Sequence, residues 1–354
     1  MTNDLSIAIL GASGFGGGEL LRLLAAHPNA GRVQALANKQ AGRSIASVHP
    51  HLRGAYPGAF STELISTGLD VLFAALPHGE FCKRWPSLRT RLDGKTHVID
   101  LSGDFRLQSA AEFELAYGGP HPCPEFLPEF AYGLPESPRI QAANFSQSTQ
   151  RIANPGCFAT AILLALMPIS AITNAVELHF SISAVTGSTG SGAAPSEGTH
   201  HPTRAHDFRA YKVFAHQHEY EVRQLLSAAA KQSAGAAPRF SLIPHSAPMV
   251  RGIYVSAQTL LPATLADCDF NAAFTDFYRT SPFIRVVEDA VARTAAVVGS
   301  NYCDINVVQQ GDQLAILVTL DNLLKGMAGQ AVQNMNLALG LPETTGLMQL
   351  GLFP

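Results

Sequence analysis

A cysteine follows an Asn-Pro-Gly turn at residues 154–157 and immediately precedes a long apolar stretch. Pro155 and Gly156 favour a turn, and the Ala/Leu/Ile-rich residues that follow predict a helix ending at Pro168. Cys157 would then lie in the first turn of that helix, where open backbone N–H groups and the positive end of the helix dipole favour a thiolate. A reactive nucleophile is one interpretation. The other is a small buried side chain, the usual state of a free cysteine.

Histidines that could serve such a nucleophile cluster further along the chain, in 199–208 and in the segment around His216 and His218. One of these two could act as proton donor and acceptor for the cysteine, with Glu221 orienting or stabilising it. A metal site is the rival interpretation, because imidazoles are common metal ligands. The histidines do not match the H-E-x-x-H helix pattern, however, so we expect no metal.

A glycine-rich turn near the N-terminus joins a predicted strand at 6–10 to a predicted helix at 17–28. Glycines in this context let backbone N–H groups approach a pyrophosphate held at the helix N-terminus. The flanking strand and helix make the motif more specific than a glycine trio alone. It predicts a dinucleotide site with five candidate residues: Gly11, Ser13, Gly14, Phe15 and Gly17.

The end of the next predicted strand, at 33–37, indicates which dinucleotide binds. NAD sites usually place Asp or Glu there to hold the ribose 2′-hydroxyl. This chain has no acid in 36–43 and offers Asn38, Lys39 and Arg43. Both cations could bind a 2′-phosphate, so we expect NADP(H). The alternative is that they are merely solvated loop residues.

Two further residues could contact a charged substrate or intermediate. Arg106 follows a predicted parallel strand, where ligands gather, and its guanidinium can hold phosphate or carboxylate in a bidentate manner. An ordinary interdomain salt bridge is the alternative. Asn154, together with the helix N–H groups near Cys157, could stabilise an oxyanion.

The elements that position these residues fall into two groups. Apolar strands alternate with helices up to residue 153, which predicts a parallel sheet covered on both faces. After Cys157, longer strand-like runs predict an α+β domain with a mainly antiparallel sheet, including a hairpin through Gln310-Gly311-Asp312. We expect an α/β protein with a Rossmann-type NADP-binding domain at 1–153 and 325–354, and a catalytic domain at 154–324. The expected later elements are strands at 176–187, 240–246, 251–261, 293–299 and 303–323, and helices at 216–230, 270–280 and 325–340.

Composition narrows the class of protein. The chain has 354 residues, 47% of them apolar and 14% charged, with a net charge of −3. That length suits two domains, and the charge gives no reason to expect a nucleic acid or a membrane as partner. The five cysteines include no C-x-x-C pair. This argues against a disulfide framework and indicates a reducing, cytoplasmic compartment.

Six segments occur in an order that resembles a known family. They are GASGFGGGEL (11–20), DLSGDFRL (100–107), NPGCFATA (154–161), HQHEYEV (216–222), PMVRGIY (248–254) and DNLLKGMAGQAVQNMN (321–336). Over the full length they are similar to the N-acetyl-gamma-glutamyl-phosphate reductases, the arginine-biosynthesis family among the aspartate-semialdehyde dehydrogenase-like enzymes. The resemblance implies a Rossmann domain, an α/β catalytic domain, NADPH and a cysteine nucleophile at Cys157.

The same resemblance assigns further residues. The family's histidine motif maps onto His216, His218 and Glu221, although Gln217 replaces its arginine and Tyr220 its proline. By family analogy Asn322 and Gly329 approach the nicotinamide. The substrate-binding candidates are Ser188, Thr189, Tyr211, Lys212 and Arg251.

The implied reaction is reduction of an acyl phosphate through a thioester, with N-acetyl-glutamyl phosphate as the expected substrate and a homo-oligomer, dimer or tetramer, as the expected assembly. The loop 186–204 resembles the branch of lysine-pathway reductases that act on carrier-protein-linked aminoadipyl phosphate, which is therefore the alternative substrate. Two other classes are a cofactor-binding regulator without turnover and a metal-dependent hydrolase. In the first, Cys157 would be unreactive. In the second, a chelator would abolish activity.

Overall fold

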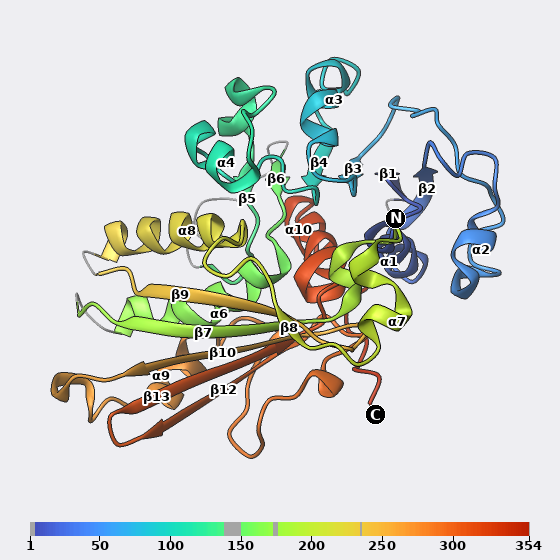
Figure 1. The fold of residues 1–354 in the computed structure, drawn as a ribbon. Coiled ribbons are helices and arrows are strands. Elements are labelled where there is room, and N and C mark those ends of the chain that lie inside the picture. Colours follow the sequence, from blue (N-terminus) through green and yellow to red (C-terminus); the bar gives the residue numbers. More distant parts are fainter. Residues whose placement is uncertain (1–3, 138–149, 173–175, 234–235, 354) are drawn as a thin grey trace. The chain divides into compact units, whose positions relative to one another are not determined.

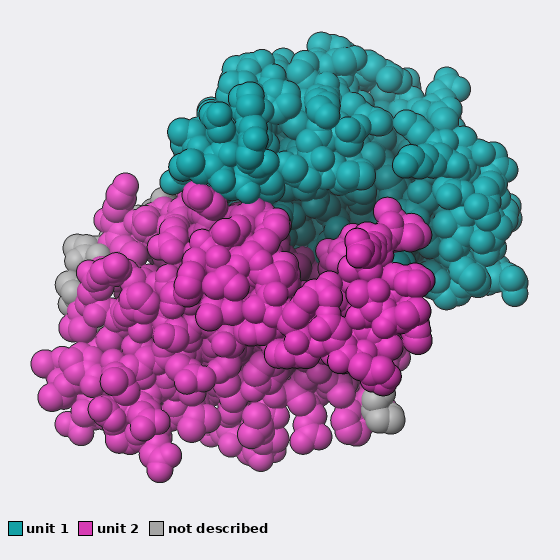
Figure 2. Space-filling view, in the orientation of Figure 1, with its two compact units in different colours: residues 1–155, 327–348 teal, residues 156–326, 349–354 magenta. Residues whose placement is uncertain are grey.

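The computed structural model describes residues 4–137, 150–172, 176–233 and 236–353. The chain divides into two compact units, which Figure 2 distinguishes by colour. The first comprises Met1–Pro155 and Met327–Met348, and the second comprises Gly156–Gly326 and Gln349–Pro354.

The C-terminal residues correct one expected boundary. We expected all of 325–354 in the first unit, but Gln349–Pro354 belongs to the second. The other two boundaries lie two residues later than expected, after Pro155 and after Gly326. In the second unit, the Leu352 N–H donates to Val298 O at 2.8 Å. Gly351 lies so close to the Ala296 backbone that an added Cβ would be 2.3 Å from its carbonyl oxygen. These contacts join the chain end to the second unit.

The first unit is built on a six-stranded sheet in the order β2-β1-β3-β4-β6-β5 (Figure 1). Every pair in this order is parallel. The strands are β1 Leu5–Leu10, β2 Ala30–Leu36, β3 Val71–Ala74, β4 His97–Asp100, β5 Ala131–Tyr132 and β6 Arg151–Ala153. The helices are α1 Phe15–Ala25, α2 Ile45–Val48, α3 Glu80–Leu88, α4 Ala110–Tyr117 and α10 Gly329–Ala338. This is the predicted Rossmann-type arrangement, in which β1 lies between β2 and β3.

The second unit is built on a seven-stranded mixed sheet in the order β11-β12-β13-β10-β7-β9-β8 (Figure 1). β11 with β12 and β7 with β9 are parallel, and the remaining pairs are antiparallel. The strands are β7 His179–Thr186, β8 Arg209–Ala210, β9 Arg239–Ser246, β10 Ile253–Leu260, β11 Ile284–Val286, β12 Cys303–Gln310 and β13 Gln313–Leu320. The helices are α6 Cys157–Ile172, α7 His201–Arg204, α8 His218–Ser233 and α9 Phe270–Phe277. The β12–β13 hairpin turns at Gly311, as expected, with φ of 60°.

Helix α6 packs against β10, β13, α8 and α9. Its residues from Phe158 to Ser170 are all buried, which explains the uniformly apolar sequence. We expected the helix to end at Pro168, but it continues to Ile172. A proline lacks the N–H that would bond to the carbonyl four residues earlier, here Leu164. The Tyr278 hydroxyl donates to Leu164 O at 2.6 Å and satisfies this carbonyl instead.

Two other expected elements also differ. Residues 293–299 do not form a strand; Thr294–Ala296 is a short 3₁₀ helix. The N–H groups of Val297 and Val298 donate to Thr294 O, so they are not available to a neighbouring strand. The last expected helix, at 325–340, begins with a π-helical turn, Leu324–Ala328, before α10. Such turns are often found at functional sites.

Candidate active site

The Asn-Pro-Gly turn places Cys157 at the first position of α6, as predicted. The residue is half-buried there. The first hydrogen bond within the helix runs from Thr160 N–H to Gly156 O at 2.8 Å. The N–H groups of Phe158 and Ala159, in the first turn, therefore have no acceptor within the helix. Gly326 packs against Cys157, because a Cβ added at this glycine would be 2.8 Å from Cys157 Cβ.

Glu221 and His218 both contact Gly156 of this turn. Glu221 is fully buried, and its Oε2 accepts the Gly156 N–H at 3.0 Å. Its Oε1 lies 3.8 Å from His218 Nε2. The imidazole rests on Gly156, since a Cβ added at that glycine would lie 2.4 Å from Nε2. Only glycine therefore lets the histidine come this close to the residue next to Cys157.

His216 lies against the His218 backbone and the Phe158 ring. Its Nδ1 accepts the His218 N–H at 3.2 Å, and its ring meets the Phe158 ring edge-on at 5.4 Å between centroids. Burial, together with the positive charges of His218 and Lys212, lowers the pKa of His216 to about 2, against an opposing effect of Glu221. The ring is therefore neutral at physiological pH.

Tyr211 and Lys212 lie next to these histidines. The Tyr211 ring is 5.8 Å from that of His216, and burial together with the charge of Cys157 raises the pKa of its hydroxyl. Tyr211 therefore keeps its hydroxyl proton and can act as a hydrogen-bond donor. Lys212 is exposed, has a positive φ of 45°, and donates to Gln217 Oε1 at 2.8 Å. A non-glycine residue with positive φ is uncommon and marks a strained segment.

Two further second-unit candidates, Asn322 and Thr189, form a hydrogen-bonded chain. Asn322 is buried; its Oδ1 accepts the Gly252 N–H at 2.8 Å, and its Nδ2 donates to Thr189 Oγ1 at 2.9 Å. The Thr189 hydroxyl donates in turn to Val250 O at 2.8 Å. The side chains of Asn322 and Thr189 thus hold the backbone of their own unit.

Ser188 and Arg251 are more accessible than those two. Ser188 is half-buried at the start of a short 3₁₀ helix, Ser188–Ser191. Arg251 is also half-buried, with its Nε 3.6 Å from the fully buried carboxylate of Asp321. Asp321 also accepts the Gly299 N–H at 2.8 Å and so fixes the arginine to the loop before β12.

In the first unit, the glycine loop has the geometry that a dinucleotide requires. Gly11 has a φ of 81°, and a Cβ there would lie 2.2 Å from Ala75 O; a Cβ at Gly17 would lie 2.5 Å from Ala12 Cα. Gly14 caps α1 without a side-chain hydrogen bond, and no acidic residue occupies the first turn. The open N–H groups there suit an anion. Ser13 is half-buried and Phe15 is 41% exposed at this helix start.

The loop after β2 places three cofactor candidates in solvent. Asn38, Lys39 and Arg43 are all exposed, and Arg43 Nη1 donates to Gln40 Oε1 at 2.7 Å. A 2′-phosphate could reach these side chains without displacing a buried partner. The other candidate of this unit, Gly329, is buried at the start of α10.

Arg106 and Asn154 are both buried, and the Arg106 side chain bonds to the backbone carbonyl of Asn154. Arg106 Nε donates to Asn154 O at 2.7 Å, and Nη2 donates to Leu101 O at 3.2 Å. The Asn154 side chain donates to Met327 O at 3.1 Å and accepts from Asn334 Nδ2 at 3.0 Å. Asn154 is fully buried, so it holds the segment that leads into Cys157.

Comparison with known proteins identifies the family. Residues 6–144 match the semialdehyde dehydrogenase NAD-binding domain, and residues 157–322 match the semialdehyde dehydrogenase dimerisation domain. The chain is 41% identical to an N-acetyl-gamma-glutamyl-phosphate reductase of Nitrosospira multiformis, over 99% of this chain and 100% of that one. The chain belongs to the N-acetyl-gamma-glutamyl-phosphate reductase family. This confirms the family expected from the sequence.

Other relatives place this reductase family within a wider group. A Pseudomonas fluorescens reductase of the same name is 40% identical over 99% of this chain and 100% of its own. A Saccharolobus solfataricus reductase of LysW-linked L-2-aminoadipate and L-glutamate phosphate is 37% identical over the full length of both chains. Aspartate-semialdehyde dehydrogenase II of Vibrio cholerae has the same fold, with a TM-score of 0.67 at 16% identity over 95% of this chain and 98% of its own.

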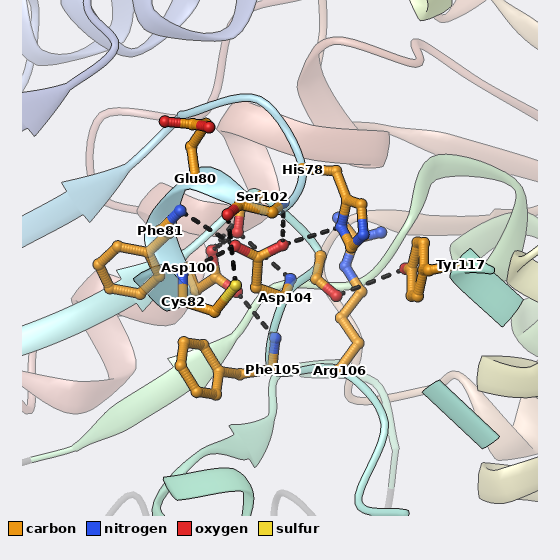
Figure 3. A network of polar contacts seen from close by, with 12 residues as sticks. His78, Glu80, Phe81, Cys82, Asp100, Ser102, Asp104, Phe105, Arg106 and Tyr117 are labelled. Carbon is orange, nitrogen blue, oxygen red and sulfur yellow. Dashed lines mark hydrogen bonds and ion pairs between the residues drawn. The ribbon is translucent and has the colours of Figure 1, made fainter. Parts of the chain in front are cut away.

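The polar network around Asp104 and Asp100 was not expected from the sequence (Figure 3). Asp104 accepts the N–H groups of Gly79, Phe81 and Cys82 at 2.7, 3.0 and 2.9 Å and thereby caps α3. Its Oδ1 is also 2.8 Å from His78 Nδ1. Burial raises the pKa of Asp104, but the bonds from His78 and the backbone outweigh it and lower the pKa to about 2.

Asp100 belongs to the same network, but its pKa is shifted in the opposite direction. It is fully buried at the end of β4 and accepts the Ser102 N–H at 2.8 Å. Burial and the charge of Asp104 raise the pKa of Asp100 to about 7, against the effects of Ser102 and Arg106. The motif 100–107 was visible in the sequence, but only its arginine was singled out as a functional residue.

Within the described ranges, no three or more His, Cys, Asp or Glu side chains gather in a way that could hold a metal ion. In the same part of the chain, no helix combines the length and apolar character needed to span a membrane.

Proposed function

We propose that this chain reduces N-acetyl-gamma-glutamyl phosphate to the corresponding semialdehyde with NADPH, releasing phosphate, in arginine biosynthesis. The observation that carries the proposal is the arrangement around Cys157, in which the helix start, Gly156, His218 and Glu221 are held together by short contacts. The family of the chain supports the same reaction.

The first chemical step is attack by the Cys157 sulfur on the acyl carbonyl. His218 takes the thiol proton, a C–S bond forms, and the C–O bond to phosphate breaks, which leaves a thioester. The N–H groups of Phe158 and Ala159 stabilise the oxyanion that develops on the carbonyl oxygen. We propose no oxyanion role for Asn154, because both ends of its amide are engaged within its own unit.

The second step converts the thioester to the aldehyde. NADPH, when bound, supplies the hydride that the carbonyl carbon accepts. The same helix N–H groups stabilise the tetrahedral oxyanion, and its collapse breaks the C–S bond. The proton that His218 took from the thiol passes to the released phosphate, and a proton from solvent, delivered through His218, goes to the departing sulfur, so that one proton is consumed overall. His216 stays neutral and positions His218 through its backbone N–H.

Other residues would bind rather than react. Lys39 and Arg43 would hold the 2′-phosphate of NADPH, and the N–H groups at the start of α1 would hold its pyrophosphate. Ser188, Tyr211, Lys212 and Arg251 remain the candidates for contacts with the acyl phosphate, of which Tyr211 is the one electrostatically coupled to Cys157. Arg106 would stabilise the segment that precedes Cys157, because its guanidinium donates to Asn154 O and Leu101 O.

We further propose a homo-oligomer, either a dimer or a tetramer, and a cytoplasmic location. The match of residues 157–322 to a dimerisation domain supports the first point. The five free cysteines support the second, because they suit a reducing compartment.

The decisive experiment measures NADPH oxidation with N-acetyl-glutamyl phosphate and, in parallel, with a carrier-linked aminoadipyl phosphate. We expect turnover with the first substrate, and loss of turnover in the Cys157→Ser variant. Turnover with only the carrier-linked substrate would move the chain to the lysine-type reaction. Turnover with neither, by a folded protein that binds NADPH, would contradict the proposed reaction.

A further inference from the structure

His78 lies at the ligand-binding edge of the first unit, but the mechanism above does not use it. It follows β3, whose next residue, Ala75, lies directly against the glycine loop: a Cβ at Gly11 would be 2.2 Å from Ala75 O. Ligands of open parallel sheets bind outside the carboxyl ends of the strands, where the strand order reverses. The order β2-β1-β3 places that reversal between β1 and β3.

The His78 ring is held firmly on two sides. Its Nδ1 is 2.8 Å from the ionised and fully buried carboxylate of Asp104. One ring face stacks on Tyr117, with 3.8 Å between centroids and 18° between planes. Figure 3 shows His78 between these two residues. A ring fixed in this way loses little further freedom when it binds a ligand.

The same ring is still open to solvent. The His78 side chain is 37% exposed, whereas the Asp104 side chain beside it is not exposed at all. With Nδ1 bonded to Asp104, Nε2 is the remaining polar atom of the ring. The protein therefore fixes a partly exposed imidazole three residues after Ala75, the residue that packs against the glycine loop. A helix cap alone would not require this, because three backbone N–H groups already bind Asp104.

We propose that His78 binds the nicotinamide half of NADPH, through its ribose or the phosphate attached to that ribose. This inference rests on the proposed use of NADPH. The 2′-phosphate of the adenosine half would lie at the end of β2, near Lys39, and the pyrophosphate at the start of α1. The other half of the dinucleotide must then extend past β1 on the β3 side, where the loop that follows carries His78.

The test compares two ligands by calorimetric titration of the full chain. NADPH contains the nicotinamide half, whereas 2′,5′-ADP contains only the adenosine half with its 2′-phosphate. His78→Asn can retain the hydrogen bond to Asp104 but has no atom equivalent to Nε2. We expect this variant to bind NADPH about three- to ten-fold more weakly, the effect of one hydrogen bond, and to bind 2′,5′-ADP as the unmodified chain does.

His179→Asn is the matched control, since His179 is exposed on β7 of the second unit; it should leave both affinities unchanged. Unchanged NADPH affinity in His78→Asn would overturn the inference and leave the proposed function intact. An equal loss for both ligands, with a lower melting temperature, would show a structural role and would also overturn it. Failure of the unmodified chain to bind either ligand would overturn both proposals.

Discussion

The backbone N–H of Gly156 donates to the Glu221 carboxylate across 65 positions of sequence, at 3.0 Å. The same carboxylate reaches His218 Nε2 with its other oxygen, at 3.8 Å. One buried group thus connects the turn that presents Cys157 with the proposed acid/base. Its structural and electrostatic contributions can be separated, because an amide can replace the first but not the second.

Glu221→Gln should therefore affect turnover more than stability. The amide oxygen can still accept the Gly156 N–H, but the negative charge next to His218 is lost. We expect kcat to fall about ten-fold or more, since the negative charge that favours a protonated imidazole during proton transfer is gone. Glu221→Ala should in addition lower the free energy of unfolding by about 1–3 kcal/mol, because a buried N–H is left unsatisfied. Equal destabilisation by both variants would contradict this separation.

Iodoacetamide should modify Cys157 before the other four cysteines. Cys82, Cys123 and Cys303 are buried, and burial raises the pKa of the Cys123 thiol to about 11. Cys268 is half-buried like Cys157 but does not begin a long helix, so it is the matched control. Peptide mapping by mass spectrometry at partial inactivation checks the order. Loss of activity that follows modification of Cys268 would contradict the assignment of the nucleophile.

The two active-site histidines should differ in function. His218→Asn should lower kcat by about 10²–10⁴, the usual effect of removing a general acid–base group, with little change in NADPH affinity. His216→Asn should have a smaller effect on kcat, because the side-chain oxygen of the new asparagine can still accept a hydrogen bond from the His218 N–H. The reverse order of effects would assign the acid/base to His216.

His216 should also make stability depend on pH. Its pKa is about 2 when folded, against an ordinary value of 6.5, so below pH 6.5 only the unfolded chain binds this proton. Stability from this group is complete above that pH and declines as the pH falls toward the folded value, by about 1.4 kcal/mol per pH unit. Urea unfolding at about pH 7.5 and 5.5 should show a loss that is smaller by about 1 kcal/mol in His216→Asn. Identical losses would contradict a neutral buried His216.

The parts of the site that the sequence predicted depend on local patterns. Cys157 could be placed because proline, glycine and a long apolar run mark a helix start within a few residues. The glycine loop could be placed because its strand and helix are adjacent in sequence. In both cases the element and the functional residue belong to one continuous segment.

The parts that were missed depend on contacts between distant segments. Asp104 caps a helix that begins 24 residues earlier, at Glu80, and nothing near Asp104 in sequence indicates this. His78 becomes notable only once its contacts with Asp104 and Tyr117 are known. The expected helix end at Pro168 was wrong for the same reason. The hydroxyl that replaces the missing proline N–H belongs to Tyr278, 114 residues away from Leu164, whose carbonyl it bonds.

Lys39→Glu tests the cofactor preference. The unmodified chain should prefer NADPH to NADH at least ten-fold in kcat/KM, since one charge-assisted contact contributes about 1.5–3 kcal/mol. Glutamate would repel the 2′-phosphate and could accept a hydrogen bond from the ribose hydroxyl of NADH, so the preference should shrink or reverse. Lys95→Glu, which changes another exposed lysine of the same unit, should leave it unchanged. Equal use of both cofactors by the unmodified chain would show that Lys39 is only a solvated cation.

Tyr278→Phe tests how α6 tolerates its internal proline. The change removes the hydroxyl that bonds to Leu164 O and leaves a buried carbonyl without that donor. We expect the free energy of unfolding to fall by about 1–3 kcal/mol, measured by urea unfolding, with kcat in the folded protein little changed. In a Pro168→Ala background the backbone N–H regained at position 168 can donate to the same carbonyl, so the same tyrosine change should cost clearly less. A double-mutant cycle measures this difference directly. Additive effects of the two substitutions would show that the hydroxyl does not compensate for the missing N–H, and the continuation of α6 past Pro168 would then need another cause.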